Sequence, residues 1–262
     1  MLIPRSVLSA FPSCADTGSG RYALGGVYLE RRENTACAVA TDGRRLIAAE
    51  WADDTAAADF PPVGLDVAPA PGSEFGETGK VIPSADCVKL ARAAKPKGRA
   101  ASKMPVLQFV ALEERTANGR AKFVATDGET TAALEVATIE GRYPKWRDVL
   151  PGDRPRVSHF TFQDEAESDN QTSGHYEWCK EARKLRAETE TKPGNVRGAV
   201  VRVRVDARFL AEVAAALDAV TGNDEDHGLT LEVPLDPTCP LVLSNEGNGV
   251  KVRGVVMPLR DK

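Results

Sequence analysis

Two aspartates, Asp42 and Asp127, have the residue type and setting that a pair of catalytic carboxylates would need. Each lies in the sequence Ala-Thr-Asp-Gly, and paired carboxylates can act as general acid and base. Asp-Gly is also a strong hairpin signal, because both central residues of a type I′ turn need positive φ. A turn accounts for both aspartates, so we predict that their role is structural.

The sequence contains only incomplete matches to phosphate-binding and metal-binding patterns. Gly18–Ala23 matches a dinucleotide-binding glycine pattern, but it precedes an expected strand and not a helix. Gly76–Lys80 resembles a phosphate-binding loop, but Glu74 replaces its first glycine and Val81 replaces its hydroxyl residue. The three histidines are far apart and form no metal-spaced pair. The sequence therefore predicts no catalytic residue, no metal, no cofactor and no enzymatic activity.

The composition restricts the class of protein. The chain has 262 residues, 42% of them hydrophobic, which is enough for one large domain or two ordinary ones. Its net charge of −4 means that any contact with DNA must come from a local patch. The five cysteines include no CxxC pair, so we expect reduced thiols. With no signal peptide or membrane-length apolar run, we expect a soluble, cytoplasmic protein without a membrane partner.

An internal repeat organises the chain. Phe123–Glu135 echoes Ala38–Glu50, and both predict a strand, a tight turn and a returning strand, with a looser echo in Val242–Val256. Short apolar strands also run into three expected helices. These helices are expected at residues 5–11, 85–94 and 207–220, with Ser84 and Asp206 as caps of the second and third.

A repeated unit of strand, helix and antiparallel strands predicts an α+β fold. The gap between the second and third helices leaves room for a further unit, which would begin with a strand at Arg156–Phe162. The residues that follow are polar and highly charged, and we expect a degenerate or extended unit with a possible helix at 176–189. Ala52–Thr78 is expected to be a long loop.

Three segments stand out in order along the chain. They are Arg21–Glu30 followed by Val39–Leu46, then Glu140–Pro151, and last Val255–Arg260. Together they resemble the bacterial DNA polymerase III beta sliding clamp family. The first is similar to the start of that clamp's middle domain, the second to the segment that closes this domain, and the third to the C-terminal tail. Clamps of this family have three domains, and the present sequence starts where the middle domain would start.

The resemblance implies a DNA-clamp fold with two domains. Residues 1–151 would match the middle domain, and residues 152–262 the C-terminal domain with its degenerate or extended polar segment at 163–194. The family closes a ring of six domains. Two domains per chain would close such a ring as a trimer, so we expect a homo-oligomer.

The function implied is that of a processivity factor that encircles double-stranded DNA without reading its sequence. Its expected partners are the duplex, a DNA polymerase, other clamp-binding proteins and a clamp loader. Basic residues of the helices would face the DNA phosphates, unless they simply form a solvated face. The DNA-facing candidates are Arg5, Tyr22, Lys89, Arg92, Lys95, Lys97, Arg99 and Lys103.

In the family, partner proteins also dock a short peptide into an apolar pocket. The matching positions are Leu24, Thr41, Gly43, Arg45, Leu46, Pro144, Val149, Phe209, Val255, Met257, Pro258 and Leu259. Burial would hold the peptide anchors, and Arg45 would help to orient the peptide. Alternatively, these residues only close a domain interface. A second functional reading is a clamp-derived adaptor or regulator that keeps the pocket but does not encircle DNA.

Overall fold

The structure is a computed structural model. It describes residues 1–18, 22–32, 34–53, 79–97, 104–113, 119–150, 203–222, 228–234 and 239–259. The chain divides into two compact units, residues 1–150 with 203–262 and residues 151–202. The second unit lies outside the described residues, and with it the predicted strand at 156–162, the polar segment 163–194 and the helix at 176–189. Most of the predicted loop at 52–78 lies outside them too.

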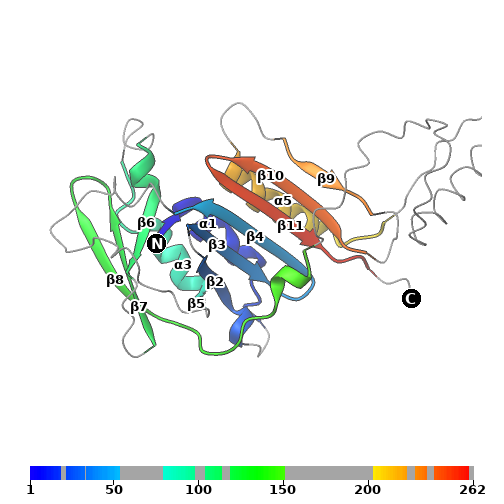
Figure 1. The fold of residues 1–262 in the computed structure, drawn as a ribbon, viewed down its shortest axis with the longest axis horizontal. Coiled ribbons are helices and arrows are strands. Elements are labelled where there is room, and N and C mark those ends of the chain that lie inside the picture. The colour runs from blue at the N-terminus through cyan, green and yellow to red at the C-terminus, as the bar shows by residue number, and fades with distance from the viewer. Residues whose placement is uncertain are drawn as a thin grey trace, which may run out of the picture. The chain divides into compact units, whose positions relative to one another are not determined.

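Two antiparallel sheets form the frame of the first unit, and the predicted α+β fold is confirmed (Figure 1). The four-stranded sheet has the order β1 (Leu2–Pro4), β6 (Phe109–Glu113), β7 (Arg120–Thr126) and β8 (Thr131–Ala137). The seven-stranded sheet has the order β5 (Lys80–Pro83), β2 (Gly26–Arg32), β3 (Thr35–Thr41), β4 (Arg45–Ala52), β11 (Val250–Val256), β10 (Leu241–Gly247) and β9 (Thr230–Glu232). Strands from both sides of the predicted domain boundary at residue 151 thus share one sheet.

The three predicted helices are present. They are α1 (Arg5–Ala10), α3 (Ser84–Arg92) and α5 (Ala207–Thr221), and the short 3-10 helices described are η1 (Phe11–Cys14), η2 (Tyr22–Leu24), η4 (Pro105–Gln108) and η5 (Trp146–Asp148). Asp206 caps α5 as predicted, accepting the backbone N–H of Arg208 at 2.9 Å. The predicted cap at Ser84 is wrong, because its hydroxyl donates to the carbonyl of Gly25 at 2.9 Å.

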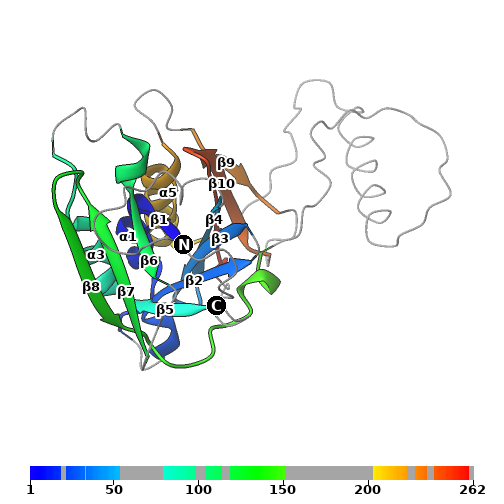
Figure 2. The same cartoon turned by 60° about the vertical axis from the view of Figure 1, so that its left-hand side comes forward.

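The two copies of the repeat exchange their first strands. β1 pairs with β6 of the second copy, and β5 pairs with β2 of the first. Pro4 lies opposite Phe109 in one sheet, and Pro83 lies opposite Gly26 in the other, so the two registers correspond. The exchange ties the copies into one unit, with α1 and α3 between the two sheets (Figure 2).

Both Ala-Thr-Asp-Gly segments form the same turn. Thr41 Oγ1 donates to the carbonyl of Arg45 at 2.6 Å, and Asp42 Oδ1 accepts the N–H groups of Arg44 and Arg45 at 2.8 and 3.0 Å. Thr126 and Asp127 make the corresponding bonds to residues 129 and 130. The structural role predicted for both aspartates is confirmed. The expected type I′ geometry is wrong, because among the described central residues only the glycines have positive φ, 85° at Gly43 and 94° at Gly128.

The two faces of the seven-stranded sheet bury different clusters. Alternation along β3 sends Ala36, Ala38 and Ala40 toward the helices, into the main core of the unit. Cys37 and Val39 point to the opposite face, where they pack with Trp146 in a smaller cluster. Trp146 thus connects this smaller cluster with the segment that follows β8.

Candidate partner-docking surface

The C-terminal tail reaches the β3–β4 turn through strand pairing. β11 pairs with β4 along its whole length and sets Val255 opposite Leu46. The tail then continues past the sheet, where the N–H of Met257 donates to the carbonyl of Arg44 at 2.9 Å, and Pro258 bridges Val205. Met257 and Leu259 leave 40% and 44% of their surface exposed, although their backbone is fixed. The tail therefore presents apolar side chains from a rigid support.

The segment that leads out of β8 forms a second support. Tyr143 and Trp146 are buried, and the ring of Tyr143 stacks on Tyr28 at a centroid distance of 4.6 Å. Nη1 of Arg147 lies 2.9 Å from Oε2 of the buried Glu30. With its backbone anchored in this way, the segment exposes Pro144 and Val149, the latter 44% exposed.

The two supports meet in one cluster. Leu24, Leu46 and Val255, all predicted docking residues, are buried there together with Tyr143 and Trp146. Accordingly, the green segment that carries η5 runs to the end of β11 (Figures 1 and 2). We call the exposed apolar side chains of these two segments the docking surface. They are Pro144, Val149, Met257 and Leu259.

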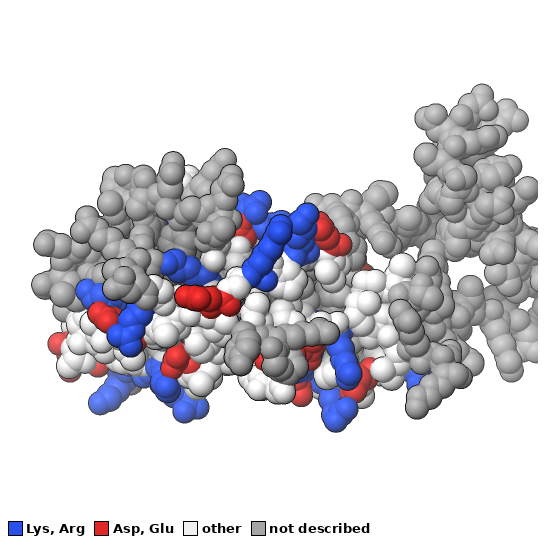
Figure 3. All heavy atoms as spheres, turned by 90° about the horizontal axis from the view of Figure 1, so that it is seen from below, with Lys and Arg blue, Asp and Glu red and all other residues white. Residues whose placement is uncertain are grey.

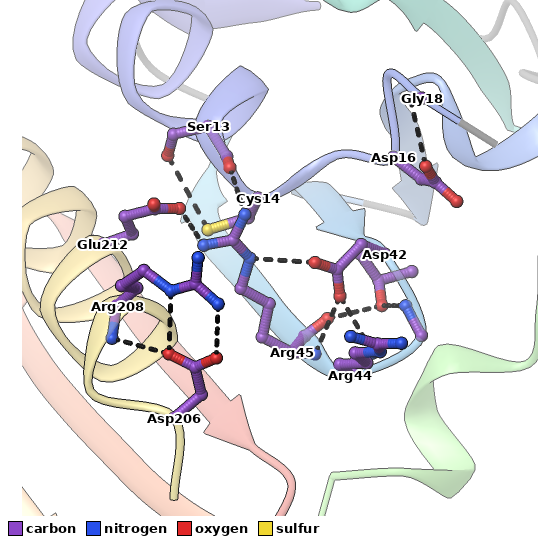
Figure 4. A network of polar contacts seen from close by, with 12 residues as sticks. Ser13, Cys14, Asp16, Gly18, Asp42, Arg44, Arg45, Asp206, Arg208 and Glu212 are labelled. Carbon is purple, nitrogen blue, oxygen red and sulfur yellow. Dashed lines mark hydrogen bonds and ion pairs between the residues drawn. The ribbon is translucent and has the colours of Figure 1, made fainter.

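Arg45 is held by contacts from α5, from η1 and from within its own turn (Figure 4). Its Nη1 pairs with Oε2 of Glu212, Nη2 donates to the carbonyl of Ser13 at 2.8 Å, and Nε lies 3.1 Å from Oδ2 of Asp42. Its guanidinium also lies over the ring of Phe209, 4.7 Å from the centroid. The residue is only 8% exposed. Nη1 and Nη2 of Arg45 are thus engaged by other residues of the protein, and its expected role in orienting a bound peptide stays a prediction.

Three other predicted docking residues lie in the β3–β4 turn or against the main core. Thr41 and Gly43 shape the turn described above, and the half-buried Phe209 packs against the main core. Sequence reasoning did not single out Tyr143 and Trp146, which pack with predicted docking residues, or Glu212, which pairs with Arg45. The two aromatic residues lie within Glu140–Pro151, the segment already noted for its resemblance to clamps, whereas nothing in the sequence connects Glu212 with Arg45.

The DNA-facing candidates are divided by burial. Lys89, Arg92, Lys95 and Lys97 are exposed on α3 and the residues after it, although Lys89 pairs with Asp86 at 2.7 Å. Arg99 and Lys103 lie outside the described residues, as does the side chain of Tyr22. Among the described residues on the face shown in Figure 3, basic and acidic side chains are interleaved.

Arg5 does not fit the DNA-facing role predicted for it. The residue is 6% exposed, and its five donor N–H groups point at backbone carbonyls. The acceptors are the carbonyls of Leu107, Ala91, Ala93, Ala94 and Thr126, at 2.6–3.2 Å. Arg5 therefore joins α1 to the end of α3 and to the second turn, and a phosphate could not reach it without breaking these bonds.

The cysteines described are free thiols, of which Cys14, Cys37 and Cys87 are buried and Cys239 is partly exposed. Burial raises the pKa of Cys37 and of Cys87 to about 12 and also raises the pKa of Cys14. Within the described residues no group of His, Cys, Asp and Glu could hold a metal ion. None of the described helices is long and apolar enough to cross a membrane.

Alkylation of the thiols tests whether Cys37 and Cys87 are buried. At about pH 9, above the ordinary thiol pKa of about 8.5, Cys37 and Cys87 should stay protonated and resist iodoacetamide, while Cys239 is alkylated. Because the thiol pKa is higher in the folded than in the unfolded state, the stability it gives is lost as the pH rises from about 8.5 toward 12. Mass spectrometry of the alkylated protein measures how far each cysteine has been labelled. Equal labelling of Cys37 and Cys239 would contradict the burial.

Comparison with known proteins places the fold. No protein-family model and no curated protein matches the chain. The DNA polymerase III beta chain of Streptococcus pneumoniae TIGR4 superposes with a TM-score of 0.57 and 15% identity, covering 100% of this chain and 64% of that one. The beta sliding clamp of C. crescentus has a TM-score of 0.53 and 18% identity, with 100% and 65% coverage. The Pseudomonas aeruginosa sliding clamp has a TM-score of 0.56 and 16% identity, with 100% and 66% coverage.

The first unit and the comparison agree on the class of fold, which is that of the bacterial sliding clamps. The resemblance noticed in the sequence is thereby confirmed at the level of the fold. The chain spans about two thirds of the length of these clamps, between 64% and 66%.

Proposed function

We propose that the chain is a sliding clamp, a polymerase processivity factor that docks partner proteins by a short peptide and encircles duplex DNA. The observation that carries the proposal is the docking surface. Its exposed side chains, among them Val149 and Met257, belong to the segment after β8 and to the tail after β11, and both of these contribute residues to, or directly follow, one buried cluster. Exposed apolar groups on a rigid support are suited to hold peptide anchors by burial, with little ordering cost. The role is one of binding and not of catalysis.

A short fluorescein-labelled peptide with one Leu and one Phe as apolar anchors tests the docking part of this proposal. Fluorescence anisotropy should show saturable binding, and an unlabelled copy of the peptide should compete. A scrambled control keeps the composition but separates the anchors, and it should bind more weakly. Equal binding of both peptides, or no binding at all, would contradict the proposal.

Assembly into a ring is supported by the internal repeat. β4 and β8 occupy corresponding places in the two copies, and the outer edge of β4 is paired with β11. The outer edge of β8 pairs with no strand among the described residues. This edge is seven residues long and contains neither Pro nor Lys, the residues that commonly block pairing. A strand from another copy could extend the four-stranded sheet there, as β11 extends the other.

Light scattering measures the assembly directly. Three copies of the 28.0 kDa chain give a mass of about 84 kDa, the value expected if six clamp domains close a ring. A monomer at micromolar concentration would rule out the ring. A monomer that still binds the anchor peptide would leave the clamp-derived adaptor as the function.

Contact with the duplex would come from α3. Lys89, Arg92, Lys95 and Lys97 carry positive charge on an exposed surface, and such groups attract phosphates without reading bases. α5 contributes less, because its exposed Arg208 is bound to Asp206 at 2.9 Å. A polymerase, a clamp loader and a cytoplasmic location complete the proposed setting.

A further inference from the structure

The two copies of the turn provide an internal comparison that isolates what Arg45 does. In the second copy Thr130 stands where Arg45 stands in the first, and the hydrogen bonds within the turn are otherwise the same. The turn therefore forms without an arginine. The burial of Arg45 has to be explained by the contacts that its side chain makes outside the turn.

Those contacts join parts of the chain that are distant in sequence. Glu212 is 167 residues from Arg45, and Ser13 is 32 residues away on the other side. The stacking contact with Phe209 adds a second link to α5. Figure 4 shows the guanidinium between the 3-10 helix that carries Ser13 and the helix that carries Glu212. The side chain of Arg45 thus fixes α5 against the β3–β4 turn.

The same turn also holds the tail of the docking surface. The carbonyl of Arg44 accepts the N–H of Met257 at 2.9 Å, and Val256 lies opposite Arg45 in the sheet. A displacement of the turn would therefore displace Met257. Through Arg45, the position of α5 and the position of the docking surface are linked by bonded neighbours.

Exposure differs greatly between the two partners of the ion pair. The side chain of Arg45 is 9% exposed, whereas that of Glu212 is 47% exposed. An exposed carboxylate adds little to global stability. Without the Glu212 charge, the buried guanidinium keeps only Asp42 as a carboxylate partner, and its Nη1 group must turn toward water or toward another acceptor. Loss of the Glu212 charge should therefore change local geometry more than the free energy of unfolding.

We propose that Glu212 is a positioning residue for partner docking. It holds Arg45 over Phe209 and thereby keeps the β3–β4 turn, the tail and α5 in the arrangement that accepts a peptide. This inference rests on the proposed docking function, and it adds that the docking surface is set by an ion pair that the peptide itself need not touch.

The test compares Glu212→Gln with Glu135→Gln, using the Leu/Phe anchor peptide. Glu135 is a matched control, because it is 61% exposed and pairs with Arg120 at 3.6 Å on the other sheet. Glu212→Gln should weaken peptide binding about fivefold to tenfold, whereas Glu135→Gln should leave it unchanged. Hydrogen exchange gives a second readout. In Glu212→Gln, hydrogen exchange should become faster both at amides 42–46 and at amides 207–212. If the ion pair stabilised only α5, exchange would become faster at 207–212 alone.

The outcomes separate the two proposals. If the unmutated chain binds the peptide and Glu212→Gln binds it equally well, the positioning role is overturned while the docking function stands. If the unmutated chain does not bind the peptide, the docking function itself fails. Arg45→Gln should show at least the same loss of binding, and combining it with Glu212→Gln should add little, because both changes remove the same ion pair.

Discussion

Replacing Arg5 by Met should destabilise the folded protein by about 3–5 kcal/mol, the largest stability effect that we expect from a single substitution. The change removes the guanidinium N–H groups that donate to five backbone carbonyls. Two of these carbonyls belong to Ala93 and Ala94, just after the end of α3. Carbonyls left without a donor in a buried place keep their full desolvation cost. Ala94 also has a φ of 39°, a left-handed conformation that a non-glycine residue adopts only when its surroundings hold it.

Urea denaturation followed by tryptophan fluorescence measures this effect, with the buried Trp51 and Trp146 as reporters. Arg208→Met is the control, because the side chain of Arg208 is 81% exposed and should change stability by less than about 0.5 kcal/mol. If Arg5→Met were as stable as Arg208→Met, the carbonyl contacts of Arg5 would contribute nothing. If it lost DNA retention with unchanged stability, Arg5 would be a DNA contact after all.

Replacing Val149 by Asp should weaken peptide docking by about 2 kcal/mol or more, roughly thirtyfold in Kd. A carboxylate in the docking surface would have to lose its water when a peptide anchor covers it. The fold should tolerate the change, because Val149 is already 44% exposed and Trp146 anchors its segment.

Met104→Asp is the control for this experiment. Met104 is also an exposed apolar residue, with 54% of its surface exposed, but it lies before β6 of the four-stranded sheet. Anisotropy titration of the anchor peptide should give an unchanged Kd for Met104→Asp. Equal losses in the two variants would show that the peptide responds to surface charge in general and that the docking surface is not the site.

Local patterns predicted much of this fold. The apolar spacing along Ala207–Val220 gave the extent of α5, and the repeated Ala-Thr-Asp-Gly segments gave two hairpins, because these signals depend on neighbouring residues. The exchange of β1 and β5 between the copies could not be predicted in this way. Leu2 pairs with Ala111, and that choice depends on which edge the folded sheets leave open and not on any residue near Leu2.

The apolar residues of the candidate site could be chosen from the sequence, whereas the contacts of its arginines could not. Val149, Met257 and Leu259 lie in segments whose sequences resemble those of sliding clamps, and all three side chains are exposed in the structure. Arg5 and Arg45 look like surface arginines in sequence, because their partners lie elsewhere in the chain. The carbonyls that Arg5 binds belong to residues 86 to 121 positions away, so only the tertiary fold reveals that it is buried.

Retention on DNA of different topology tests the central claim most directly. The chain is incubated with a nicked circular plasmid and separated from free protein by gel filtration in salt, before and after the plasmid is cut once. A clamp that encircles DNA should elute with the circle and be lost from the linear form, because it slides off the ends while the phosphate contacts remain the same. Equal retention on both forms, or none on the circle, would contradict the proposal that this chain is a ring around the duplex.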